Sequence, residues 1–410
     1  IQLSRAAFET NVSLFFIVAG VWFYLTCFVA KTKKSGILLS VSGICFGLAM
    51  FTYQNARIFV PLLVICLLFI YRKQLIKMRR ALIGPTAVSV IFLLVLIPTF
   101  FSGGGQVRFN GISVFIDPKP QLRSQQLAEE DKVAGVGFGS ILHNQRFAYI
   151  PQIIQNYFVH FNPEYLFFTA DADTHHAPQV GLLYLWDLPF IVAGGYFLYK
   201  NKYPKEAKKI ITVWFLLAAV GSSLTWEVPH ALRTEIYLPT YQIFAAIGLF
   251  NLLVLSNHKK VVFVTLGTLL SLNFFYYIYQ YFVHLPTDYS KAWFYGRAQA
   301  AQATEEIKSK YDKVVVSTSL QQPYMFWLYN VAYDPARYLQ EGGTVSGGFA
   351  ENNNHFEKYE FRQIDYENEI KYKTKILWVG TPKDFPTGVN IVKTIYYLNG
   401  EKAIIFVSHD

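Results

Sequence analysis

The amino-acid sequence predicts a polytopic α-helical membrane protein with a small extracytoplasmic α/β domain at its C-terminal end. Three observations support this fold class: about eight apolar segments divide residues 1–283, basic residues occupy every second connection between them, and the composition turns polar after Val283. Of the 410 residues, 53% are hydrophobic and only 16% are charged, whereas soluble domains contain about 25% charged residues. We therefore expect a transmembrane domain over residues 1–283 and a soluble domain over residues 284–410.

The predicted spans are close to the length of about 20 residues that a helix needs to cross the hydrocarbon core. The third and the sixth are shorter and would borrow residues from their outer ends. The spans cover residues 11–30, 37–53, 58–71, 81–101, 180–199, 210–224, 236–255 and 261–283.

The distribution of Lys and Arg predicts which connections share a compartment. Clusters of these residues lie at 31–34, 72–80, 200–209 and 259–260. Short cytoplasmic loops of membrane proteins carry such an excess of positive charge, so we expect these four inside. The long connection 102–179 and everything after Val283 then lie outside. Fifteen of the 37 basic residues fall in these loops, which accounts for much of the net charge of +10, and no motif indicates binding to nucleic acid.

The cysteines and the start of the chain carry two further expectations. All three cysteines, Cys27, Cys45 and Cys66, lie in predicted spans, so no disulfide is expected in the soluble regions. The chain begins at Ile1, and no signal peptide precedes the first span. We expect it to be the N-terminally truncated piece of a longer protein.

The outside regions contain predicted secondary structure of their own. In the loop 102–179, residues 121–134 favour a helix, and residues 141–161 favour either a helix on the outer membrane surface or a loop folded onto the bundle. In the C-terminal domain, residues 290–312 favour a helix, and strands are predicted at 313–317, 376–380, 389–398 and 403–407.

Ionisable residues at the outer ends of spans are the candidates for chemistry, because burying such groups beside lipid is costly. Arg5 and Glu9 are four residues apart and would share a helix face, either as a surface ion pair or as part of a site. Arg57 follows Asn55 in a short outer turn. It either extends along the membrane to the interface or binds a phosphate group.

Two further clusters lie in the long loop and in a later outer turn. The first could bind a divalent metal ion, hydrogen-bond to a phosphate or sugar, or belong to a plain loop with capping aspartates. The second concentrates ionisable groups in a short turn beside apolar helices, which favours a functional role. The first cluster is Asp171, Asp173, His175 and His176, and the second is Glu227, His230, Arg233 and Glu235.

These segments resemble the GT-C class of membrane glycosyltransferases, specifically the bacterial relatives of protein O-mannosyltransferases and aminoarabinose transferases. The resemblance rests on Ser4-Arg5 with Glu9, on residues 162–176, on Pro229-His-Ala-Leu-Arg233 with Tyr237-Leu-Pro239, and on the extracytoplasmic C-terminal domain. It implies an enzyme of a prokaryotic plasma membrane that works on the extracytoplasmic face. Such an enzyme transfers a sugar from a polyprenyl-phosphate donor to an acceptor hydroxyl on a protein or on a cell-envelope glycan or lipid.

The resemblance also implies roles for single residues. Glu9 matches a second acidic position, while the principal catalytic carboxylate would belong to an outside loop that precedes this chain. Arg233 matches the arginine that contacts the donor phosphate. We expect a donor-binding cavity with Arg5, Arg57 and Arg233 on its phosphate side and with His175, His176 and His230 around it. A divalent metal at Asp171 and Asp173 is an open alternative, and no other cofactor is expected.

Two other classes of function compete with the enzyme. A transporter or flippase of a lipid-linked sugar would favour charges at mid-depth, broken helices and internal repeats, of which the sequence has few. A membrane scaffold whose C-terminal domain binds partners is the third possibility.

Overall fold

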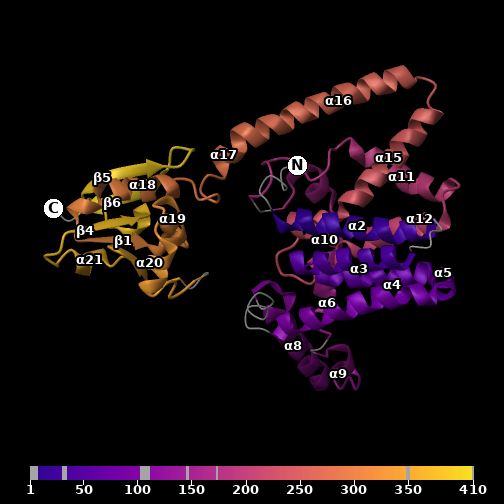
Figure 1. The fold of residues 1–410 in the computed structure, drawn as a ribbon, viewed down its shortest axis with the longest axis horizontal. Coiled ribbons are helices and arrows are strands. Elements are labelled where there is room, and N and C mark those ends of the chain that lie inside the picture. Colours follow the sequence, from indigo (N-terminus) through magenta and orange to yellow (C-terminus); the bar gives the residue numbers. More distant parts are fainter. Residues whose placement is uncertain are drawn as a thin grey trace. The chain divides into compact units, whose positions relative to one another are not determined.

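The computed structural model describes residues 8–29, 35–101, 111–144, 147–171, 174–347 and 351–408. The chain is 65% helical with a small C-terminal sheet, and it forms two compact units, Ile1–Ile278 and Tyr279–Asp410 (Figure 1). The boundary expected from the sequence, after Val283, lies five residues beyond Ile278.

Five helical segments among the described residues are long and apolar enough to cross a membrane, as expected for an integral membrane protein. They coincide with the first, second, fourth, seventh and eighth predicted spans. Their main helices are α2 (Glu9–Val29), α3 (Ser35–Thr52), α6 (Ile83–Phe101), α15 (Leu238–Leu255) and α16 (Lys259–Tyr279).

The other three predicted spans are helical but shorter. They contain α4 (Ala56–Ile70), α11 (Asp187–Lys200) and α12 (Lys205–Leu217), with 15, 14 and 13 residues. At 1.5 Å per residue such helices are only about 20 Å long, against a hydrocarbon core of about 30 Å. The expected number of eight crossings therefore stays a prediction.

Glycine allows two of these helices to touch along their backbones. A Cβ atom added at Gly194 of α11 would lie 1.8 Å from the carbonyl oxygen of Phe244, and one added at Gly248 of α15 would lie 2.0 Å from that of Phe190. Small residues at helix contacts permit this close approach in membrane proteins. Helices α11 and α15 are thus held together at a crossing point where no larger side chain fits.

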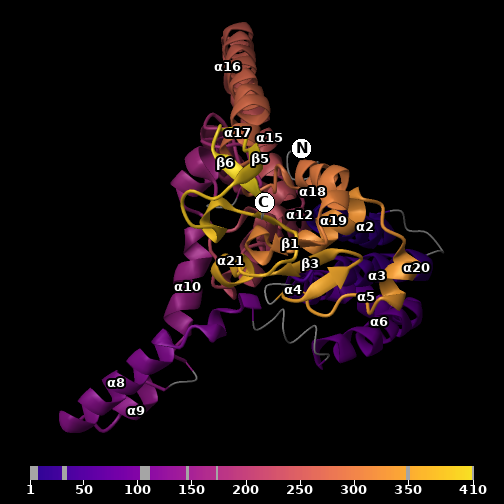
Figure 2. The same ribbon diagram turned by 90° about the vertical axis from the view of Figure 1, so that its left-hand side faces the viewer.

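The long loop folds into short helices. The helix predicted at 121–134 corresponds to α8 (Lys119–Val133), which lies beside α9 (Gly139–Leu142) (Figure 2). The segment 141–161 contains part of α9 and α10 (Ile150–Val159) rather than one continuous helix.

Helix α10 buries the polar side chain of Asn156 and exposes three apolar side chains. Asn156 is 2% exposed and donates hydrogen bonds to the carbonyl oxygens of Ser223 and Thr225. Ile150, Ile154 and Phe158 are 46%, 51% and 64% exposed on the other side. A helix in water would place these residues the other way round, so this arrangement suits contact with lipid.

The second unit is built on a six-stranded sheet in the order β2-β3-β1-β4-β6-β5. Strand β1 is parallel to β3 and β4, whereas the β2–β3, β4–β6 and β5–β6 pairs are antiparallel. The strands are β1 (Lys313–Ser317), β2 (Asn354–Phe356), β3 (Tyr359–Arg362), β4 (Ile376–Gly380), β5 (Ile391–Tyr396) and β6 (Lys402–Ser408). Four of them match the predicted strands to within two residues at each end, and β2 and β3 were not predicted.

Alternation along the central strands supplies a hydrophobic core on each face of the sheet. Val314 and Val316 of β1 pack with α18 (Arg297–Ile307), α19 (Pro323–Asn330) and α20 (Pro335–Gln340). Val315 between them packs on the opposite face with Trp378 of β4. Both cores therefore follow from the two-residue period of a strand.

Candidate functional site

The carboxylate of Asp171 joins two segments that are about sixty residues apart in the sequence. Its side chain is 4% exposed, and its Oδ1 lies 2.9 Å from Nε2 of His176. Its Oδ2 accepts a hydrogen bond from the backbone N–H of Ala231 and lies 3.9 Å from Nδ1 of His230. Asp171 thus fixes the loop after η3 (Tyr165–Thr169) to the start of α14 (Ala231–Thr234).

His176 faces an oxygen atom with each ring nitrogen. Nε2 contacts the Asp171 carboxylate, and Nδ1 lies 3.1 Å from the carbonyl oxygen of Ala177. Both oxygens can only accept, so the ring is suited to the doubly protonated form. Burial lowers the pKa of His176, but the hydrogen bonds to Asp171 and Ala177 outweigh it, and the net effect is a raised pKa. Asp171 and His176 therefore form a buried hydrogen-bonded pair.

Arg233 is held in place by neutral groups and by one exposed carboxylate. Its NH1 donates to Oγ1 of Thr225 at 2.8 Å and to the carbonyl oxygen of Glu227 at 3.0 Å. Its NH2 donates to the Glu227 carboxylate at 3.0 Å. The Arg233 side chain is 11% exposed, whereas that of Glu227 is 49% exposed. The carboxylate is thus the one anionic partner in these contacts and lies on the open side.

The turn between α3 and α4 also contacts this segment. Asn55 is 8% exposed, and its Nδ2 donates a hydrogen bond to the backbone carbonyl of Arg233. Gly221 leaves room for it, because a Cβ there would lie 1.6 Å from Oδ1 of Asn55. The position of Arg233 therefore depends on α13 (Val220–Ser223) as well.

The start of α2 lies against the same cluster. Oγ1 of Thr10 donates a hydrogen bond to the buried carboxylate of Glu235. The ring of Phe8 contacts that of His175 edge-on, with 4.9 Å between centroids. Glu9 is the first residue of α2 and is exposed. Glu9, the candidate acid, and Arg233, the candidate phosphate ligand, therefore belong to segments that contact each other through Thr10 and Glu235.

A second buried histidine, His160, is linked to Arg233 through Ser222 and Thr225. Nδ1 of His160 lies 2.7 Å from the carbonyl oxygen of Asn156, and Oγ of Ser222 lies 2.7 Å from Nε2. Burial lowers the pKa of His160 to about 4, so the ring is neutral at pH 7. Nδ1 then carries the proton and Nε2 accepts from Ser222. Ser222 is bonded through its carbonyl to Thr225, which in turn binds Arg233.

The structure places three of the predicted site residues in mutual contact. These are Asp171, His176 and His230, and Arg233 lies in α14, whose first residue, Ala231, donates its N–H to Asp171. The ring of His175 contacts Phe8, just before α2. Arg57 lies two residues after Asn55, and its Nε donates to the carbonyl oxygen of Met50 at 3.1 Å. Arg5 and Asp173 lie outside the described residues. Within the described ranges, no group of three or more His, Cys, Asp or Glu side chains is placed to hold a metal ion.

Three supporting residues were not among the sequence-based candidates. Thr10 and His160 act through hydrogen bonds to groups distant in the sequence, whereas Thr225 bonds to Arg233 and Ser222 nearby. Thr225 directly precedes the predicted cluster 226–239, so its place beside that cluster was the only available signal.

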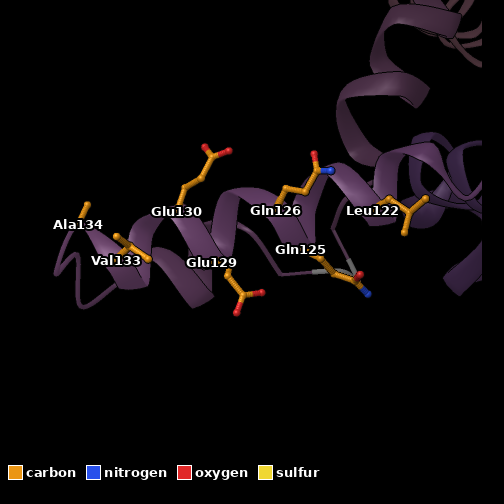
Figure 3. Close-up of a pocket in the computed structure, with 7 residues that line it drawn as sticks. All are labelled: Leu122, Gln125, Gln126, Glu129, Glu130, Val133 and Ala134. Carbon is orange, nitrogen blue, oxygen red and sulfur yellow. The ribbon is translucent and has the colours of Figure 1, made fainter.

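A surface depression on α8 is not part of this site. Its volume is about 870 Å³, and all seven of its lining residues, from Leu122 to Ala134, come from one exposed stretch of chain (Figure 3). A single helix face cannot enclose a ligand, and its charged residues are Glu129 and Glu130, which would repel a phosphate group.

Comparisons of the chain with protein families, with curated proteins and with solved structures found no match.

Proposed function

We propose that this protein is a membrane glycosyltransferase of the GT-C type. It transfers a sugar from a polyprenyl-phosphate donor to an acceptor hydroxyl, on a protein or on a cell-envelope glycan or lipid. The reaction takes place on the extracytoplasmic face of a prokaryotic plasma membrane, where the positive-inside rule puts the turns that contain Arg233 and Asp171.

The observation that carries this proposal is the setting of Arg233. Thr225 and Asn55 fix the residue from the protein side, while the exposed Glu227 carboxylate occupies the outer edge of the guanidinium group. Arginine binds carboxylates and phosphates with the same two-pronged geometry. A lipid phosphate can therefore replace Glu227 without moving the arginine.

The reaction needs a group that accepts a proton and a group that stabilises the leaving phosphate. The acceptor oxygen attacks the anomeric carbon as a carboxylate takes its proton, and the bond from that carbon to the phosphate oxygen breaks. The negative charge that appears on the lipid phosphate is stabilised by Arg233, and we assign His230 as a second group that binds the donor. Among the described residues, we assign the role of proton acceptor to the carboxylate of Glu9, the first residue of α2.

Asp171 has a positioning role in this proposal. Its two oxygens are already used by His176, Ala231 and His230, and it is nearly buried. It therefore orients His230 and the start of α14 and does not act as the base.

The test is sugar transfer by the full-length protein in proteoliposomes containing a polyprenyl-phosphate sugar. Removing a preorganised group that stabilises charge costs about 10²–10³ in kcat, so we expect a loss of this size for Arg233→Ala. Arg337→Ala is the matched control, because Arg337 is an exposed arginine that also pairs with a glutamate.

Each result has a defined meaning. Unchanged transfer by a folded Arg233→Ala variant would refute the proposal. If the wild type moves a lipid-linked sugar across the membrane without transferring it, and Arg233→Ala loses this movement, the transporter or flippase is favoured instead.

A further inference from the structure

A groove runs between α11, α15 and α16, separate from the Arg233 cluster. Its volume is about 540 Å³, within the range of about 300–1,000 Å³ typical of ligand sites. Asp187 and Gln242 lie near the N-terminal ends of α11 and α15 and border one end of the groove, while Leu253 and Phe263 border the other.

The end near Asp187 is polar. Trp186, Asp187 and Gln242 supply an indole N–H, a carboxylate and an amide. The carboxylate accepts a hydrogen bond from the backbone N–H of Tyr184 at 3.3 Å. The indole Nε1 of Trp186 is buried and has no hydrogen-bond acceptor in the part of the chain that the structure describes. A buried donor without an acceptor is costly, so a ligand that brings an acceptor would be favoured here.

The remainder of the groove is apolar and elongated. Ala245, Ala246 and Leu249 follow Gln242 along α15, and Leu266 and Leu270 of α16 face them across the groove. From Gln242 to Leu253 the helix rises by about 16 Å. The small side chains of Ala245 and Ala246 leave space in the groove. The shape suits a single extended hydrocarbon chain.

Charge decides which lipid fits. Asp187 is the one carboxylate among the residues that line the groove, and this lining contains no Lys, Arg or His. A phosphate group alone would meet a carboxylate with no cation to balance it. A primary ammonium group would pair with that carboxylate, and an ester or phosphate oxygen next to it would accept from Trp186.

We infer that this groove binds one acyl chain of a membrane lipid whose headgroup carries a primary amine. The ammonium group contacts Asp187, and the chain lies along Ala245, Ala246 and Leu249. The inference needs these helices to lie in a bilayer, and it does not depend on sugar transfer.

The experiment uses the full chain in vesicles of phosphatidylethanolamine and phosphatidylglycerol. A trace of phosphatidylethanolamine with a photoreactive group in its acyl chain labels the protein, and peptide mapping locates the label. We expect label in the stretches 245–253 and 263–270. Ala246→Trp should remove it by filling the groove, whereas Leu94→Trp on α6, at a residue 67% exposed, should leave it unchanged.

A second groove-filling variant guards against misfolding of Ala246→Trp. Gly267 lines the groove from α16, and a Cβ there would have no atom within 4 Å, so Gly267→Phe should fold normally and also remove the label. Label that persists in the folded variants overturns the inference.

Competition identifies the headgroup. Against the wild type, phosphatidylethanolamine should displace the label about tenfold better than phosphatidylglycerol, the ratio expected from one charge-assisted hydrogen bond. Asp187→Asn should abolish this preference. Equal competition by phosphatidylglycerol, or stronger competition by polyprenyl phosphate, would overturn the assignment of an amine headgroup.

Discussion

Gly221 offers the most direct test of how Arg233 is held. In Gly221→Ala, the new Cβ would lie 1.6 Å from Oδ1 of Asn55 and 2.8 Å from its Cγ. The amide must swing away, and its hydrogen bond to the Arg233 carbonyl is then lost. Leaving a buried acceptor unpaired costs about 1–3 kcal/mol, and the better helix propensity of alanine returns about 0.5–1 kcal/mol. We expect a net loss of stability of up to about 2.5 kcal/mol.

The assay is reversible unfolding in mixed detergent micelles, followed by tryptophan fluorescence. The matched control is Gly195→Ala in α11, where an added Cβ meets no atom within 4 Å. This variant should be unchanged or slightly more stable, because it gains helix propensity without a clash.

A double-mutant cycle shows whether the effect passes through Asn55. In an Asn55→Ala background the amide is already absent, so Gly221→Ala should cost almost nothing. If the two single effects add in the double variant, the contact between Gly221 and Asn55 does not cause the loss of stability.

Three further predictions concern other contacts. The pKa of His176 is raised, so its pairing with Asp171 stabilises the fold fully below the unfolded pKa of about 6.5. This stability is lost as the pH rises through the folded pKa. Unfolding measured from pH 5 to 9 should show this fall in stability for the wild type and a flatter profile for His176→Gln. Gly194→Leu should destabilise by about 1–3 kcal/mol or more, because the Phe244 carbonyl cannot move aside as a side chain can; wild-type unfolding behaviour would disprove the close contact. Glu227→Gln should lower KM for the polyprenyl-phosphate donor by removing the competing anion, and a raised KM would show that this carboxylate helps to bind the donor.

The helices that the sequence predicted well are those whose apolar residues continue for a full membrane crossing. The sixth predicted span was extended too far, to residue 224, whereas α12 ends at Leu217 and α13 follows as a separate turn. The residues Gly221-Ser222-Ser223 are used for contacts with Asn55 and His160, which hydropathy alone does not reveal.

The missed strands have a different cause. Strands β2 and β3 have three and four residues, and β3 alternates buried Tyr359 and Phe361 with charged neighbours. Such a short alternation is hard to distinguish from a loop, and β2 is stabilised by pairing with β3 rather than by its own composition.

The candidate site was partly predictable for a related reason. Charged side chains at the ends of apolar segments are visible in the sequence, and the cluster around Asp171 and Arg233 contains several of them. Its supporting contacts are hydrogen bonds to backbone groups, for example from Asn55 to Arg233 and from Ala231 to Asp171. Every residue has a backbone, so these partners could be identified only from the fold.

The two outer strands of the C-terminal sheet limit how that domain can associate. Strand β2 offers only three residues, and β5 departs from regular pairing between Ile391 and Lys393 and again between Ile395 and Tyr396. Edge strands that are short, such as β2, or that are bulged and contain a lysine, such as β5, pair poorly with an incoming extended peptide. Even when many copies crowd on one membrane, fibre-like stacking of these sheets is therefore disfavoured, and a partner protein would have to recognise the helices or the loops.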